Sequence, residues 1–233
     1  MFSRWKMTER SPAQRVTVTL AGAGVFAALA ALLTLAKAEI PFPLIPYLQV
    51  DFAEVPILIA FFLFGPVAAV ISSVIHWLFL NVQGSDAPLG PMIKFLAELS
   101  TISGLWLGNS FYQRIKGSRS HPTIALSMML GGGIASRVAA MTVVNYVILL
   151  YVAPIFFHAD YLGFARLTLQ QSIGLQFASD FGVLFYTLLF TAVYNMVNLL
   201  VAAVPAGLIV SPITTSFKHI TSIEAWLARN THA

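Results

Sequence analysis

Four ionisable side chains stand inside otherwise apolar stretches of the sequence, where an unpaired charge is costly. Lys94 and Glu98 lie four residues apart, so on a helix they share one face and can pair. Arg137 falls in the middle of a later stretch and needs a carboxylate, for which Glu98 is the nearest candidate in depth. Asp180 stands near the start of the last stretch. These charges indicate a structural network between helices, a ligand contact by one member, or a proton relay with fewer carboxylates than usual.

A second polar set is neutral and rich in amides. Asn145 and Tyr146 lie toward the end of one apolar stretch. Asn195 and Asn198 lie in the last stretch, next to Tyr194. A buried Asn offers a donor and an acceptor, which suits an amide-like or uracil-like edge of a ligand. Any one Asn can equally bond between helices, but three of them with two tyrosines favour a polar binding site.

Small residues recur at every fourth position in the first apolar stretch. Ala23, Ala27 and Ala31 form one ridge on a helix, with Gly24 and Ala28 beside it. Such a ridge lets another helix approach closely, whether the helix belongs to a partner subunit or to this chain. The spacing leaves both interpretations open.

These residues require a scaffold of helices that cross a membrane. Of the 233 residues, 58% are hydrophobic and 9% are charged, which differs strongly from the composition of a soluble domain. The segment 154–171 is mixed and partly amphipathic. The predominantly apolar stretches cover residues 16–36, 51–82, 90–112, 122–152 and 178–209. The sequence therefore predicts an all-α integral membrane protein that passes several times through the cell membrane.

The number of spans depends on Gly65-Pro66, which interrupts the second stretch. If residues 52–80 formed one helix, the basic segment 114–119 would lie opposite the basic N-terminal tail, against the positive-inside rule. A turn at Gly65-Pro66 instead places the basic residues of both tails and of this segment on one side. Each half is then shorter than the roughly 20 residues needed to cross and must pack inside the protein. We expect six spans with both termini in the cytoplasm.

The predicted organisation has one membrane domain between two cytoplasmic tails. Pro41, Pro43 and Pro46 exclude a regular helix from the loop 38–52, which joins the first two spans outside the cell. The first span is expected to be retained rather than cleaved as a signal peptide, because residues 37–41 lack a small-x-small site. The N-terminal tail covers residues 1–15, the six-helix membrane domain residues 16–210, and the C-terminal tail residues 211–233.

The sequence also argues against several classes of function. It contains no Gly-x-x-x-x-Gly-Lys-Ser/Thr run for nucleotide phosphates and no cysteine for thiolate metal sites or thiol catalysis. Without a nucleophile–base pair or a metal constellation, we expect neither enzymatic activity nor a cofactor. His76 is expected to be a hydrogen-bonded packing residue. Because the basic residues flank apolar spans, the net charge of +4 indicates contact with lipid headgroups rather than nucleic acid.

Two patterns in the chain resemble a known family. The first comprises Ile40-Pro41-Phe42-Pro43, then Pro46-Tyr47-Leu48-Gln49-Val50-Asp51-Phe52-Ala53-Glu54-Val55-Pro56, and Phe64-Gly65-Pro66. The second comprises Arg137-x-x-x-Met141-x-x-x-Asn145-Tyr146, then Pro154, and Tyr194-Asn195-x-x-Asn198. Together they resemble the substrate-binding S components of energy-coupling factor (ECF) vitamin transporters, most closely the riboflavin-specific branch, over about residues 18–210. The chain departs from that branch at Asn198, where Lys is usual.

The resemblance implies a six-helix fold that holds a vitamin near the outer face, under the Pro-rich loop. It also implies that Ala23, Ala27 and Ala31 dock onto a transmembrane coupling subunit that binds two ATPase subunits. The residues that it places near a flavin are Glu39, Tyr47, Leu48, Asn145 and Asn195.

An isoalloxazine ring needs a flat, apolar slot with a few placed hydrogen-bond partners. Phe42 and Tyr146 can add walls to this slot, and Gln83 can reach the ribityl hydroxyls. Tyr146 and Gln83, with Lys94, Glu98 and Asn198, complete the predicted substrate-binding set. Riboflavin is then the transported ligand and not a cofactor.

Two rival hypotheses stay open at this point. The first keeps the fold but changes the cargo to another vitamin or precursor, and Asn198 motivates it. The second is a self-sufficient proton-coupled carrier that uses Glu98, Arg137 and Asp180.

Overall fold

The computed structural model describes residues 12–83, 87–115, 122–157 and 160–216, together with Trp226. The basic residues predicted to face the cytoplasm at positions 4–10, 116–119 and 218–229 lie outside these described residues, as does most of both predicted tails. In chain order the elements are α1 (Pro12–Leu35), β1 (Glu39–Phe42), β2 (Ile45–Asp51), α2 (Glu54–Phe64), α3 (Pro66–Gln83), α4 (Leu89–Ile115), α5 (Pro122–Val147), the π-helical segment η1 (Ile148–Val152), α6 (Ala153–Phe157), α7 (Tyr161–Ile173) and α8 (Asp180–Ser216).

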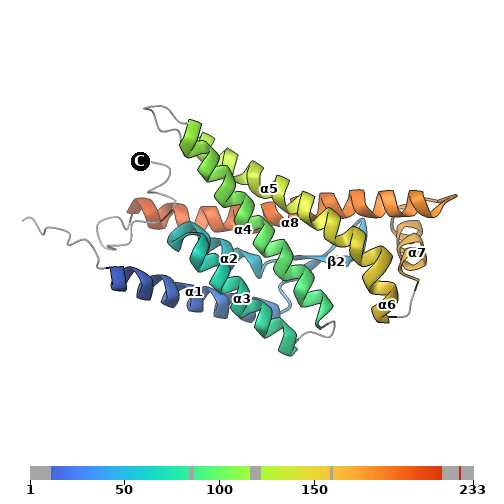
Figure 1. Cartoon of the computed structure of the whole chain (residues 1–233), viewed down its shortest axis with the longest axis horizontal. Helices are drawn as coiled ribbons and strands as arrows, with labels where there is room; N and C mark the ends of the chain where they lie inside the picture. Colours follow the sequence, from blue (N-terminus) through green and yellow to red (C-terminus); the bar gives the residue numbers. More distant parts are fainter. Residues whose placement is uncertain (1–11, 84–86, 116–121, 158–159, 217–225, 227–233) are drawn as a thin grey trace, which may run out of the picture.

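The long helices run back and forth across the molecule. Helix α1 begins and α8 ends at the left of Figure 1, whereas the hairpin β1–β2, α6 and α7 lie toward the other end. Among the described residues, four helices are long and apolar enough to cross a membrane: Ala13–Leu35, Pro66–Gln83, Thr123–Ile155 and Asp180–Ile213. This arrangement agrees with the prediction of an all-α membrane protein that crosses the membrane several times. Six crossings and cytoplasmic termini stay predictions.

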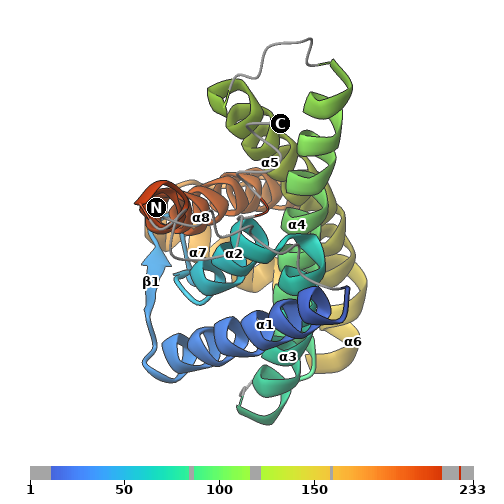
Figure 2. The ribbon, with the colours of Figure 1, turned by 90° about the vertical axis from the view of Figure 1, so that its left-hand side faces the viewer.

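The Gly65-Pro66 break is a turn between two helices, as expected from the sequence. Gly65 has φ +94°, a conformation that favours glycine, and its N–H donates to the Phe61 carbonyl at 2.8 Å. Pro66 then begins α3, where its fixed φ suits a first helical residue. Ten of the 11 residues of α2 are buried, and Figure 2 shows α2 in the middle of the helices. This short helix therefore persists because the protein encloses it.

The small-residue ridge of α1 faces the interior of the chain. Ala23 and Ala27 are 0% and 1% exposed, and Ala31 is half-buried. Ala23 packs with Ala60 and Ala68 of α2 and α3. The expected docking of a partner on Ala23 and Ala27 is therefore corrected: these alanines let the neighbouring helices of this chain approach α1.

Helices α4 and α5 lie side by side in both views and touch through their backbones (Figures 1 and 2). A Cβ added to Gly104 would lie 2.4 Å from the carbonyl oxygen of Gly132. A Cβ added to Gly108 would lie 2.2 Å from the carbonyl oxygen of Met128. The Gly104-x-x-x-Gly108 spacing thus serves a close helix crossing, as small residues commonly do in membranes.

The Pro-rich loop folds as an antiparallel hairpin. Glu39 pairs with Asp51 and Ile40 with Val50, and the register becomes irregular after Pro41. Each strand has only one partner, so prolines are tolerated on the free edges. The sequence correctly excluded a helix here but did not predict strands.

The hairpin packs against α7 and α8. Its buried residues Phe42, Ile45 and Val50 form one apolar cluster with Leu169 of α7. The ring of Phe42 also meets that of Tyr194 on α8 at 5.6 Å. These contacts hold the hairpin over the polar residues of the interior.

Candidate functional site

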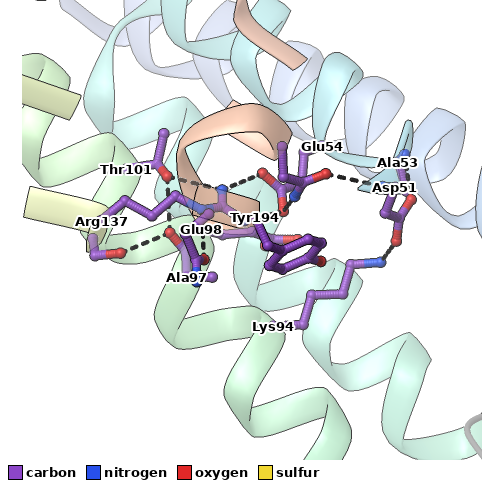
Figure 3. Close-up of polar contacts among 12 residues, drawn as sticks. Asp51, Ala53, Glu54, Lys94, Ala97, Glu98, Thr101, Arg137 and Tyr194 are labelled. Atoms are coloured by element: carbon purple, nitrogen blue, oxygen red, sulfur yellow. Dashed lines mark hydrogen bonds and ion pairs between the residues drawn. The ribbon is translucent and has the colours of Figure 1, made fainter. Parts of the chain in front are cut away.

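The centre of the candidate site is a buried ion pair between α2 and α5. Arg137 Nη1 lies 2.5 Å from Glu54 Oε2, and Nη2 lies 2.9 Å from Oε1 (Figure 3). The two residues are 1% and 3% exposed. Two parallel hydrogen bonds of this kind are strong and fix the planes of both groups. The prediction that Arg137 pairs with Glu98 is wrong, because both terminal nitrogens of the guanidinium donate to the carboxylate of Glu54.

Side chains from α4 and α8 complete this pair. Asn195 Oδ1 accepts from Arg137 Nε at 3.1 Å, and Thr101 Oγ1 accepts from Nη1 at 3.1 Å. Asn198 Nδ2 donates to Glu54 Oε1 at 2.8 Å. The polar atoms of a buried pair must be satisfied in this way for the pair to be tolerated. One ion pair thus ties together α2, α4, α5 and α8.

Asp51 connects this network to the hairpin. Its backbone N–H donates to Asn198 Oδ1 at 2.9 Å, and its carboxylate accepts from the N–H of Ala53 at 2.6 Å. The same carboxylate forms an ion pair with Lys94 of α4 (Figure 3). The side chains of Lys94 and Asp51 are 20% and 16% exposed. A continuous polar chain therefore runs from the end of β2 to Arg137.

Tyr194 joins the same region from α8. Its electrostatic interactions include both Glu54 and Asp51, and Figure 3 shows its ring between the two ion pairs. Its hydroxyl donates to the Gln49 carbonyl of β2 at 2.7 Å. The hairpin is thus held to α8 by the backbone of Gln49 as well as by Asp51.

The hairpin residues predicted to bind a ligand lie toward its surface. Glu39 is exposed, and the Gln49 amide lies within 2.8 Å of both Glu39 carboxylate oxygens when its nitrogen points toward them. Tyr47 is 42% exposed and its ring lies 5.5 Å from that of Phe164 in α7. Partial burial raises the pKa of the Tyr47 phenol to about 12, so it stays protonated at neutral pH. Leu48 is partly buried in the hairpin cluster.

Glu98 does not pair with Lys94, which is a second correction to the predicted charges. Glu98 Oε1 lies 3.0 Å from His76 Nδ1, while Lys94 is committed to Asp51. The Oγ1 of Thr34 lies 3.0 Å from His76 Nε2. His76 is therefore fully buried and bonded through both ring nitrogens, as the sequence predicted for a packing residue.

Asp180 lies at the start of α8 and is far more exposed than the buried charges. Its side chain is 75% exposed and accepts from Arg166 Nη2 at 2.5 Å. Arg166 also donates to the Phe177 carbonyl at 3.0 Å. The expectation that Asp180 belongs with Arg137 and Glu98 is corrected, because its partner is on α7.

Three predicted site residues stand apart from the polar chain. Asn145 Nδ2 donates to the Met141 carbonyl of its own helix at 2.7 Å. Tyr146 is 40% exposed, with its ring 6.3 Å from that of Tyr151. Gln83 is exposed at the last residue of α3. Within the described ranges, no hydrogen bond joins Asn145, Tyr146 or Gln83 to the network.

The sequence interpretation did not assign Glu54, Asp51 and Thr101 to the site. Glu54 carried a usable signal, because it opens an otherwise fully apolar helix and a mid-span Arg must find a carboxylate. Asp51 ends the Pro-rich loop within the same short run. Thr101 gave no such signal in the sequence, because a threonine in a membrane helix usually bonds to a carbonyl of its own helix.

No family model matches the chain. It is 31% identical over 150 residues to the riboflavin transporter RibU of Staphylococcus aureus (strain TCH60), an alignment that covers 64% of this chain and 72% of that protein. It is 33% identical over 126 residues to the riboflavin transporter FmnP of Bacillus subtilis (strain 168), covering 52% of this chain and 62% of that protein.

A solved structure shares the fold. The S component of a bacterial ECF transporter superposes with a TM-score of 0.50 at 24% sequence identity. The match covers 78% of this chain and 98% of that one. Together with the sequence similarity to RibU, this likeness agrees with the resemblance read from the Pro-rich run and the amide pattern. The chain belongs to the family of the riboflavin transporter RibU and has the fold of an S component of an energy-coupling factor transporter.

Proposed function

We propose that this chain is the high-affinity riboflavin-binding membrane subunit of an ATP-driven ECF transporter. The similarity to a protein named riboflavin transporter, over 72% of that protein's length, carries the proposal. Partner subunits supply the work of transport: a transmembrane coupling subunit and two ATPase subunits. The chain itself has no phosphate-binding run for ATP and performs no chemical reaction on the vitamin.

The vitamin binds between the hairpin and the polar chain beneath it. Tyr47 and Leu48 supply apolar surface for the flat ring system. Glu39 is exposed and available to a ligand hydroxyl. Asn145 contributes Oδ1, which accepts no hydrogen bond from the part of the chain that the structure describes, because only its Nδ2 is committed. Lys94 lies at the partly exposed end of the polar chain, where its side chain is 20% exposed, and approaches the ligand from α4.

The other predicted residues support the site in different ways. Asn195 and Asn198 have their side-chain oxygen and nitrogen atoms bonded within the protein, so they position Arg137, Glu54 and Asp51 rather than touch the vitamin. Tyr146 and Gln83 complete the proposed contacts from the ends of α5 and α3.

The absorption spectrum of the purified protein tests the proposal directly. A co-purified flavin, or saturable quenching of the fluorescence of added riboflavin, is the expected result. A protein with neither property, but with a thermal shift on another vitamin, would instead support the same fold with a different cargo. Uptake driven by a pH gradient in vesicles without ATPase subunits would overturn the dependence on partners.

A further inference from the structure

Two polar bridges leave α4 one helical turn apart, one to the last residue of the hairpin and the other to the helix that precedes the hairpin. The first runs from Lys94 to Asp51, the last residue of β2. The second runs from Glu98 through His76 to Thr34, which is the last residue but one of α1. Thr34 precedes Glu39, the first residue of the hairpin, by five positions, so the two bridges tie α4 to the helix before the hairpin and to the last residue of the hairpin.

The hydrogen-bond roles in the second bridge follow from its chemistry. When Glu98 is ionised, it accepts from Nδ1–H of His76 at 3.0 Å, and Nε2 accepts from the hydroxyl of Thr34 at 3.0 Å. When Glu98 is protonated, it donates to Nδ1, and Nε2–H donates to the Thr34 oxygen, so the bridge is complete in either form. His76 and Glu98 are 0% and 3% exposed, so this bridge lies deeper than the Lys94–Asp51 pair.

Thr34 behaves differently from the other threonines of its helix. The hydroxyls of Thr17 and Thr19 donate to the carbonyls of Ala13 and Arg15, four residues earlier. This is the usual choice of a threonine in a membrane helix, because the local carbonyl is always within reach. Thr34 instead bonds across 42 positions to α3. The Thr34 hydroxyl therefore links α1 to α3 instead of bonding to a carbonyl of its own helix.

Glu98 retains a second polar atom that a purely structural role does not explain. Its Oε2 is buried and has no hydrogen-bond partner within the described residues. Such an atom carries a desolvation cost, and isolated buried polar atoms of this kind call for a specific reason. The other oxygen, Oε1, is the atom that holds the imidazole of His76, so Glu98 is retained in the interior for this one contact.

We propose that Thr34, His76 and Glu98 are positioning residues for vitamin retention, because they lock the end of α1 from which the hairpin starts. The Lys94–Asp51 pair holds the other end of the hairpin sequence, the last residue of β2. The proposal rests on the proposed function in one respect, namely that the hairpin covers the bound vitamin. It replaces the direct ligand contact expected of Glu98 with an indirect role through α1.

The test uses the isosteric substitution Thr34→Val, which removes the hydroxyl but keeps the shape of the side chain. Thr34→Ser retains the hydroxyl and should restore the bridge. Thr17→Val is the matched control, because it removes a hydroxyl of the same helix that bonds only locally. Thr34 is half-buried, so all three variants should fold.

Two measurements are made on each full-length variant in detergent. Hydrogen exchange of the hairpin amides without ligand should rise about fivefold in Thr34→Val, as expected for the loss of one hydrogen bond. The dissociation rate of riboflavin, followed by recovery of its fluorescence, should rise by a similar factor. Association and the spectrum of the bound flavin should stay unchanged. Thr34→Ser and Thr17→Val should behave like the original protein in both measurements.

The two measurements separate this proposal from the proposed function. Unchanged hairpin exchange in Thr34→Val overturns the positioning role even if riboflavin binds tightly. Faster exchange with unchanged dissociation overturns the link to retention. If the original protein binds no riboflavin, the proposed function fails, whereas hairpin exchange still decides whether the bridge locks α1.

Discussion

At the scale of single residues, the pairing of Arg137 with Glu54 has the largest predicted effect on stability. Arg137→Met should lower the free energy of unfolding by about 3 to 5 kcal/mol, because it leaves the Glu54 carboxylate buried without its partner. Thermal unfolding of the detergent-solubilised protein measures this loss. The double variant Arg137→Met with Glu54→Leu should recover part of it, since both charges are then gone. A double variant less stable than Arg137→Met would contradict this account.

Asn145 offers a second residue-scale prediction, this time for binding. Its Nδ2 is bonded within its own helix, so only Oδ1 is available to the vitamin. Asn145→Ala should therefore weaken riboflavin binding by about 10-fold, near the lower end of the range for one or two unmet hydrogen bonds. Titration of riboflavin fluorescence measures the affinity. An unchanged affinity would remove Asn145 from the site.

The sequence indicated which residues need partners but not which partners they find. The need of Arg137 for a carboxylate followed from its place in an apolar span, but the nearest carboxylate in estimated depth was the wrong one. The i,i+4 spacing of Lys94 and Glu98 allowed a local pair. Both residues instead bond to other elements, since Asp51 and His76 approach from the hairpin and α3. The relative depth and rotation of separate helices depend on tertiary packing, which a single sequence does not specify.

At the scale of elements, the backbone contact between α4 and α5 is the least tolerant feature. Gly108→Ala should prevent normal packing, because the added Cβ would lie 2.2 Å from the Met128 carbonyl oxygen and neither backbone can move freely. Gly131→Ala is the matched control on α5, since a Cβ at that position meets nothing within 4 Å. The yield of monodisperse protein and its thermal unfolding temperature compare the two. Equal tolerance of both substitutions would contradict the close crossing.

The elements themselves were more predictable than their contacts. The apolar stretches correspond to the observed helices, and the Gly65-Pro66 break separates α2 from α3 because both residues act through the local backbone. The hairpin was missed for the opposite reason. Its strands are stabilised by the packing of Phe42 and Val50 on α7 and α8, and a run with three prolines gives no strand pattern of its own.

At the scale of the whole molecule, the face of α1 available to a partner differs from the face that the sequence suggested. Ala28 is exposed, whereas Ala27 is 1% exposed against neighbouring helices. Ala28→Trp should block co-purification with the coupling and ATPase subunits while leaving riboflavin binding intact. Ala27→Trp should abolish both, because an indole does not fit inside the fold. Assembly of Ala28→Trp with its partners would show that docking uses another surface.

The pairing of the interior charges also determines how the protein responds to an electric field. Moving one elementary charge across a membrane changes its free energy by about 2.3 kcal/mol for each 100 mV of membrane potential. Glu54 and Arg137 sit within 2.9 Å of each other, and Asp51 and Lys94 are in direct contact, so the members of each pair share one depth and feel opposing forces that cancel. The membrane potential therefore exerts almost no net force on these two ion pairs. A dependence of riboflavin binding on membrane potential would therefore have to act through a group other than these two ion pairs.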